Sequence, residues 1–129
     1  MAKKMILLFS HKLNEKQIKI AKDEYAVEDF VYLSTELQQI WSDISPDIIS
    51  LEQTLEPIKK YIIRILQKDD IVLIQGDFGA TYIMVNFIKE LDAIPVYATT
   101  RRKIEEIIDE DGKTIKKSIF EFRRFREYE

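Results

Sequence analysis

Short apolar segments alternate with amphipathic ones along this chain of 129 residues. An apolar run without polar interruption is typical of a strand that is covered on both faces of a sheet. Four such runs predict four strands, at Lys4–Phe9, Phe30–Leu33, Ile71–Gln75 and Ile94–Ala98.

The segments between these strands have helical periodicity. Asn14–Gln17 resembles a capping box and predicts a helix that ends near Tyr25. Thr35–Gln38 predicts the start of a short helix. A further helical segment begins at Ser50–Gln53, and Pro57 either breaks it or lies in the first turn of a second helix. Apolar stripes at helical spacing complete the pattern at 58–66 and 83–91.

The predicted order is therefore β-α-β-α-α-β-α-β, which favours an α/β fold with right-handed crossovers and a parallel sheet. The pattern changes after Arg101. Lys103–Ile108 and Thr114–Tyr128 flank the turn-rich Asp109–Gly112, and this arrangement predicts a C-terminal β-hairpin. The length fits a single domain over residues 1–129.

Composition narrows the class of protein. Hydrophobic residues make up 46% and charged residues 33%, so the chain can bury a core and stay in solution. No apolar run approaches the ~18 residues of a membrane span, and the run before Ser10 is too short for a signal peptide. The absence of cysteine excludes disulfides and thiolate metal sites and fits a cytoplasmic location.

The net charge of −3 argues against general binding to long DNA or RNA. The charge is nevertheless uneven, because residues 99–129 carry 9 basic and 8 acidic groups, whereas residues 1–98 carry 11 and 15. The bases of the C-terminal part cluster at Arg101–Lys103 and at Arg123, Arg124 and Arg126. Two readings remain open, a solvated face of a strand pair and a local patch that binds a small phosphate ligand.

Ligands of parallel α/β sheets collect beyond the carboxyl ends of the strands. Here the first strand ends in Ser10 and His11, the third in Gln75–Gly79, and the fourth in Thr99, Thr100 and Arg101. If the strands are parallel, these segments meet at one edge of the sheet.

The turn after the third strand is the strongest anion-binding signal. Gly76 and Gly79 are two of the three glycines, and they lie where a strand gives way to a helix, so backbone N–H groups of Gly79–Thr81 are predicted to face a phosphate. The turn lacks the lysine of a P-loop and the glycine spacing of a dinucleotide site. Asp77 has three possible roles: to orient His11, to cap the helix, or to repel a misplaced anion.

His11 is the single histidine and the natural candidate for proton transfer near neutral pH. The alternative is a partly buried histidine or a helix cap. Arg101 could bind phosphate in bidentate fashion, or could be a surface residue at a turn. Phe78 and Tyr82 could stack on a base but more often such residues pack in the core, as we also expect for Trp41. Gln38 and Gln39 could face the ligand edge.

Several separated segments together resemble a small stand-alone CRISPR-associated ring nuclease, of the kind found beside type III CRISPR systems. They are Phe9–His11, Val31–Leu33, Leu37–Trp41, Gln75–Tyr82, Met84–Val85, Pro95–Thr100 and Phe122–Tyr128. The resemblance implies a Rossmann-like fold related to CARF domains, which sense cyclic oligoadenylate. It also implies a homodimer that binds cyclic tetra-adenylate across its two-fold axis and linearises it without a metal or other cofactor, by attack of a ribose 2′-hydroxyl on the adjacent phosphodiester.

This chemistry agrees with the residues, since a ligand that supplies its own nucleophile needs only positioning and charge stabilisation. The expected catalytic residues are His11, Ser10 and Arg101, and the expected ligand-binding residues are Gly76, Asp77, Phe78, Gly79, Ala80, Thr81, Thr99 and Thr100. Two other functions remain open. The chain could bind and sequester the ligand without cleaving it, or it could be an interaction domain that docks through its terminal hairpin.

Overall fold

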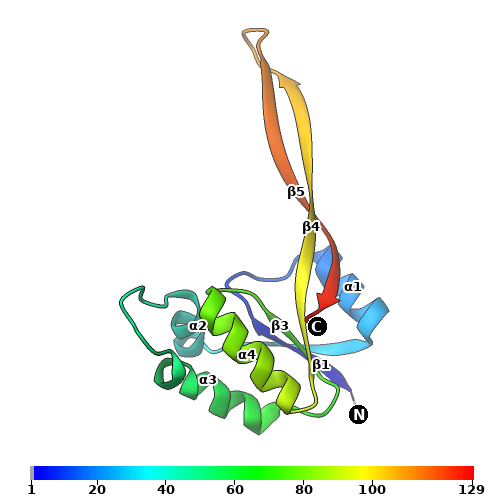
Figure 1. Cartoon of the computed structure of the whole chain (residues 1–129). Coiled ribbons are helices and arrows are strands. Elements are labelled where there is room, and N and C mark those ends of the chain that lie inside the picture. The colour runs from blue at the N-terminus through cyan, green and yellow to red at the C-terminus, as the bar shows by residue number, and fades with distance from the viewer. Residues whose placement is uncertain (1) are drawn as a thin grey trace.

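The computed structural model describes residues 2–129 and has one five-stranded sheet with helices on both faces (Figure 1). In chain order the elements are β1 (Lys3–Leu8), α1 (Glu15–Tyr25), β2 (Val27–Tyr32), α2 (Thr35–Ser42), α3 (Glu52–Ile65), β3 (Ile71–Ile74), α4 (Phe78–Glu90), β4 (Ile94–Ile108) and β5 (Thr114–Glu127). The strands are arranged β2-β1-β3-β4-β5. β2, β1, β3 and β4 pair in parallel, and β5 returns antiparallel to β4.

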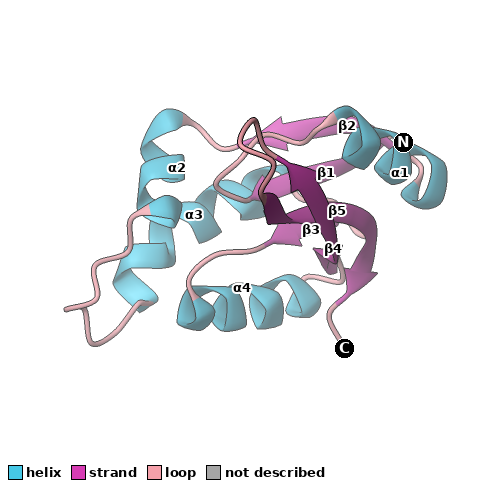
Figure 2. Ribbon diagram, turned by 90° about the horizontal axis from the view of Figure 1, so that it is seen from above, coloured by secondary structure: helices cyan, strands magenta, loops and turns pink. Residues whose placement is uncertain are grey.

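The sheet separates two apolar clusters. Figure 2 shows the helices around the sheet from above. Successive side chains of a strand point to opposite faces. Met5 and Leu7 of β1 therefore pack in the cluster that contains α1, whereas Ile6 and Leu8 pack in the cluster that contains α2, α3 and α4. All four side chains are buried, so the predicted covering of this strand on both faces is confirmed.

The predicted element order and the α/β class are confirmed, although the complete sheet is mixed rather than purely parallel. Some boundaries were wrong. The second strand runs over Val27–Tyr32 rather than Phe30–Leu33. α2 begins at Thr35 as predicted, and Ser34 caps it, because its side chain accepts the Leu37 N–H. Pro57 neither breaks the third helix nor starts a new one, since it lies inside the continuous α3. The buried side chains of Leu55, Ile58 and Ile62 offset the backbone hydrogen bond that proline cannot donate.

The largest difference from expectation is the length of β4. We expected the fourth strand to end near Ala98 and a separate hairpin to follow, but one strand runs through Thr99–Arg101 to Ile108. Residues 100–122, which we call the arm, are thus a β-ribbon that projects from the body of the molecule (Figure 1). A tight turn closes it, with Gly112 at φ 75°.

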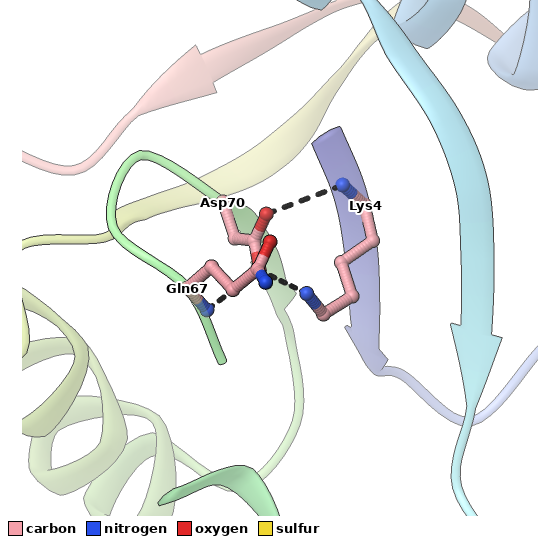
Figure 3. Close-up of polar contacts among 3 residues, drawn as sticks. All are labelled: Lys4, Gln67 and Asp70. Atoms are coloured by element: carbon pink, nitrogen blue, oxygen red, sulfur yellow. Dashed lines mark hydrogen bonds and ion pairs between the residues drawn. The ribbon is translucent and has the colours of Figure 1, made fainter. Parts of the chain in front are cut away.

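A buried ion pair fixes the edge of the sheet where the parallel strands begin (Figure 3). Asp70, which is 1% exposed, lies 2.7 Å from the Nζ of Lys4 and accepts hydrogen bonds from the backbone N–H groups of Lys4 and Gln67. The charge is therefore surrounded by three donors. Among the described residues, no helix is long and apolar enough to cross a membrane.

Candidate functional site

A cavity of about 310 Å³ lies at the carboxyl ends of β1 and β2. The segment that follows β1 forms one wall with Ser10 and His11, and α2 forms another with Gln38 and Gln39. Tyr32, at the end of β2, also lines the cavity. The strands β1, β2 and β3 end at the same edge of the sheet, which we call the carboxyl edge. Ligands of parallel sheets bind at such an edge, next to the strand from which the connections diverge. β1 is that strand here, because it lies between β2 and β3.

Hydrogen bonds from α2 hold the wall that carries Ser10. The Nε2 of Gln38 donates to the carbonyl oxygen of Phe9 and to the Oγ of Ser42, both at 2.8 Å. The Ser42 Oγ is in turn 2.9 Å from the Ser10 Oγ. The two hydrogens of the Gln38 amide group are therefore both engaged, and the carbonyl Oε1 is the polar group that this side chain can offer to a ligand.

His11 lies at the mouth of this cavity and is exposed. Its ring meets the ring of Phe9 edge-on, with centroids 5.4 Å apart. The alternative of a buried or helix-capping histidine is wrong, because Asn14 provides the reciprocal capping box of α1. His11 is thus accessible to a ligand and flanked by an aromatic ring.

The turn after β3 is built around Trp41. Its indole N–H donates to the carbonyl of Gln75 at 3.1 Å, and its side chain is 2% exposed, so the prediction that Trp41 belongs to the core is confirmed. A Cβ at Gly76 would stand 2.9 Å from the indole ring. The close approach of Trp41 therefore explains this glycine without a ligand.

The start of α4 differs from the predicted phosphate cradle. Asp77 caps the helix, and its carboxylate accepts the N–H of Ala80 at 3.0 Å, while its backbone carbonyl accepts the N–H of Thr81 at 2.8 Å. Two of the three amides expected to face a phosphate thus already have acceptors, and Gly79 is the third. The Oγ1 of Thr81 is buried without a hydrogen-bond partner, beside Tyr82 and Tyr128 rather than in the cavity that holds His11.

The aromatic residues of this helix are more exposed than expected. Phe78 and Tyr82 could either stack on a base or pack in the core, and the core alternative is wrong, because Phe78 is 95% exposed and Tyr82 72% exposed. Both lie on the side of α4 that the apolar cluster does not use, since Ala80, Met84 and Ile88 fill that cluster. Phe78 therefore presents an uncovered ring at the carboxyl edge, directly after the capping residue.

Thr99–Arg101 lies inside β4 rather than at the end of a strand. β4 extends beyond the carboxyl edge, and these residues therefore lie past that edge. Pairing aligns Leu7 with Leu73 and Leu73 with Val96. β1 ends at Leu8 and β3 at Ile74, so Thr99 and Thr100 of β4 lie beyond the same edge of the sheet from which Ser10 and His11 follow β1. The expected convergence of the three segments on one edge therefore holds, although its stated cause, the end of the fourth strand, was wrong.

The side chains of this segment differ in what they offer. The Thr99 Oγ1 donates to the carbonyl of Arg124 at 3.0 Å, so it supports the β4–β5 pair. Thr100 and Arg101 are exposed, and Arg101 pairs in register with Glu121. The hydrogen bond that Lys103 donates to Glu121, and second its positive charge, lower the pKa of Glu121. This carboxylate therefore already has Lys103 as its partner. Arg101 therefore remains a cation available at the surface.

The described residues contain no group of three or more His, Asp or Glu side chains that could hold a metal ion. Sequence reasoning missed Ser42 and Tyr32 as part of the site, and gave Gln38 only a minor place. A signal was present, because Gln38 and Ser42 are one helical turn apart and share a face of α2.

The comparisons with known proteins agree on one family. The model of the "Uncharacterized protein MJ1673 family" matches residues 3–126. "Uncharacterized protein MJ1673" of Methanocaldococcus jannaschii is 48% identical over 125 residues, which cover 97% of this chain and 96% of that protein. No solved structure gives a significant match. The chain therefore belongs to the MJ1673 family.

Proposed function

We propose that the chain is a ring nuclease, which binds cyclic tetra-adenylate at the carboxyl edge and linearises it without a metal ion. In this proposal the sheet is a Rossmann-like one related to CARF domains, and the protein acts as a homodimer in the cytoplasm to switch off type III CRISPR signalling. The observation that carries the proposal is the cavity beside β1, where an exposed histidine adjoins a serine that α2 holds in place.

The hydrogen-bond chain in this cavity favours Ser10 as a donor. Gln38 donates to the Ser42 Oγ, so the Ser42 hydroxyl can donate onward to the Ser10 Oγ. The Ser10 O–H then points its hydrogen to a ligand, as a phosphate oxygen requires. Arg101 and the N–H of Gly79 supply further positive charge along the same edge, and Phe78 supplies a face on which a base can stack.

The reaction needs no nucleophile from the protein. The 2′-oxygen of one ribose forms a bond to the adjacent phosphorus, and the bond from that phosphorus to the 5′-oxygen of the next nucleotide breaks. His11 takes the 2′-hydroxyl proton and later releases it to solvent, and the leaving 5′-oxygen takes a proton from water. The products are a 2′,3′-cyclic phosphate and a 5′-hydroxyl. Proton transfer of this kind contributes about 10²–10⁴-fold in rate.

Base selection follows from Gln38. Its N–H groups are both engaged within the protein, so it meets a ligand as an acceptor. The 6-amino group of adenine is a donor, whereas guanine has a carbonyl oxygen at that position. An acceptor fixed in this way favours adenine, because guanine would leave two acceptors facing each other.

The test is incubation of purified protein with cyclic tetra-adenylate in the presence of a chelator, followed by chromatography of the products. We expect a linear product with a 2′,3′-cyclic phosphate, and cyclic hexa-adenylate run in parallel reports the preferred ring size. Intact ligand after prolonged incubation with excess protein would overturn the enzymatic proposal.

A second candidate is a module that binds the same ligand and sequesters it. The observation that favours it is the capping of α4 by Asp77, which places a carboxylate where a catalytic anion cradle would need free amides. This leaves His11 with few supporting groups. Tight binding by calorimetry, with no turnover, would select this function.

A further inference from the structure

The arm is the part of the molecule that its own fold leaves uncovered. Every residue from Thr100 to Ile108 is exposed, as are those from Thr114 to Ser118 (Figure 1). Two antiparallel strands that pack against nothing are only marginally stable in water. The arm is nevertheless continuous and paired along its whole length, from Thr100 with Phe122 to Ile108 with Thr114.

One face of the arm carries three large apolar side chains, with the cross-strand pair of Glu106 and Lys116 between them. Alternate residues of a strand share a face, and the pairing of Arg102 with Phe120 puts that phenylalanine on the face of Ile104 and Ile108. The side chain of Ile104 is 61% exposed, that of Ile108 is 74% exposed and that of Phe120 is 68% exposed. Three large apolar side chains left exposed on one face of a projecting element favour an interaction site.

Charge identifies the partner. The base of the arm is basic and its tip is acidic. The base carries Arg101, Arg102 and Lys103, with Glu121 as its acidic member, and Arg123 and Arg124 follow it directly in the chain. The tip carries Asp109, Glu110 and Asp111, with Lys113 as its basic member. If a second arm of the same sequence lies beside the first in the opposite direction, the acidic tip of each arm meets the positively charged end of the other arm, where that arm leaves the body of the molecule.

The spacing of the apolar residues fits the same arrangement. Ile104 and Ile108 are equally far from Glu106 along β4, and in the sequence Arg102 and the turn residue Glu110 are also equally far from it. Reversal about Glu106 therefore sets Ile104 of one copy against the partner's Ile108, and Arg102 against the partner's Glu110. A surface that is complementary to itself under a two-fold rotation is the requirement for an isologous dimer.

We propose that the arms of two copies of this chain pack antiparallel, through the face of Ile104, Ile108 and Phe120, to form the dimer contact. This inference specifies the interface of the homodimer in the proposed function. It can be tested without any nucleotide, so failure of the dimer and failure of ring cleavage are separate results.

Sedimentation velocity with a concentration series measures the dimer. We expect the native chain to sediment as a dimer and Ile104→Lys to raise the dissociation constant at least tenfold. Ile49→Lys is the matched control, because Ile49 is fully exposed in the connection between α2 and α3 and should leave the dimer unchanged. Circular dichroism and thermal melting confirm that each variant is folded.

A charge exchange tests the direction of packing. The tip variant Glu110→Lys/Asp111→Lys spares Asp109, whose carboxylate forms the turn by accepting two backbone N–H groups. The base variant is Arg102→Glu/Arg123→Glu. Each variant alone should dimerise at least tenfold more weakly, whereas an equimolar mixture should form a heterodimer, because each basic tip then meets an acidic base.

A native chain that remains monomeric at tens of micromolar would overturn the proposal. So would a dimer that both charge variants retain unchanged, or a mixture of the two that fails to associate. If the chain is monomeric on its own and its arm binds a nucleic acid or an unrelated protein, the proposed dimer contact is wrong and that molecule is the partner of this face.

Discussion

The indole ring of Trp41 lies against the backbone of Gly76, so closely that a Cβ on this glycine would be 2.9 Å from the ring. The contact joins α2 to the turn after β3, and the Trp41 N–H bond to the Gln75 carbonyl reinforces it. The two walls of the carboxyl edge therefore depend on one helix, which also holds Ser10 through Ser42.

Gly76→Ala should destabilise the protein by about 1–3 kcal/mol, because the added methyl group must displace a buried ring. Gly79→Ala is the matched control. Its Cβ would lie 3.3 Å from the tip of the Leu51 side chain, and alanine favours the helix that begins there. We expect Gly79→Ala to be neutral or slightly stabilising in urea unfolding. Equal losses for both variants would contradict the role of Trp41.

Asp70→Ala should cost about 2–4 kcal/mol, since it leaves the Lys4 ammonium and two backbone N–H groups without their buried acceptor (Figure 3). Asp23→Ala provides the comparison. Asp23 is 3.4 Å from Lys19 in an exposed pair, which should contribute less than about 0.5 kcal/mol. Chemical denaturation of the two variants measures both values, and a small loss for Asp70→Ala would show that water replaces the carboxylate.

Alkaline pH should weaken the fold through two tyrosines. Burial, and then a neighbouring tyrosine, raises the pKa of Tyr128, whose hydroxyl donates to the Ile74 carbonyl at 2.6 Å. Burial, and then Glu127, raises the pKa of Tyr25, which donates to the Phe125 carbonyl. A raised pKa in the folded state means stability that is complete below the unfolded value of 10.0 and is lost as the pH rises through the folded value.

Phenylalanine cannot ionise, so the urea midpoints of Tyr128→Phe and Tyr25→Phe should fall less steeply than that of the native protein as the pH rises above about 10. Tyr82→Phe, at an exposed position, should keep the native pH dependence. An unchanged slope in both Tyr128→Phe and Tyr25→Phe would exclude these tyrosines as the cause of the pH dependence.

His11→Ala should lower the single-turnover rate of ring cleavage about 10²–10⁴-fold while the affinity for cyclic tetra-adenylate changes little. Ser10→Ala should weaken both, because the lost hydroxyl contacts the ligand before and during the reaction. Rapid-quench kinetics separates the two parameters. A native single-turnover rate in His11→Ala would remove this residue from the mechanism.

Gln38→Leu should remove the preference for a base with an amino group. We expect the native protein to bind adenosine monophosphate about tenfold more tightly than the purine analogue that lacks the 6-amino group, a difference of one hydrogen bond. Gln38→Leu should bind the two equally. Ser42→Ala disturbs the same network but keeps the acceptor, so it should retain the preference in calorimetric titrations.

The sequence predicted the order of the elements well, because buried strands and amphipathic helices leave distinct periodicities. It placed Ser10, His11 and the turn at Gly76 on one edge, because parallel strands share their direction. It could not predict that β4 continues through Thr99–Arg101, since an exposed ribbon of alternating charged and apolar residues resembles a strand that ends and restarts.

The details of the site were harder to predict for a different reason. Whether Asp77 caps a helix or faces a ligand depends on a single side-chain torsion, which no local pattern determines. The place of Gln38 in the site depends on a hydrogen bond to Phe9, which is far away in the sequence. Such contacts appear only when the strands have been assembled.

The continuity of β4 has a mechanical consequence. A single hydrogen-bonded strand leads from the core pair with β3, past Gln75, whose side chain accepts the Ala98 N–H, to the tip of the arm. The arm therefore has no loose hinge of its own, and the irregular pairing between Thr99 and Thr100 is the one place along the described β4–β5 pair where it can yield. Movement of the arm is therefore expected to bend β4 at this irregularity, next to Ala98, whose N–H the Gln75 side chain holds.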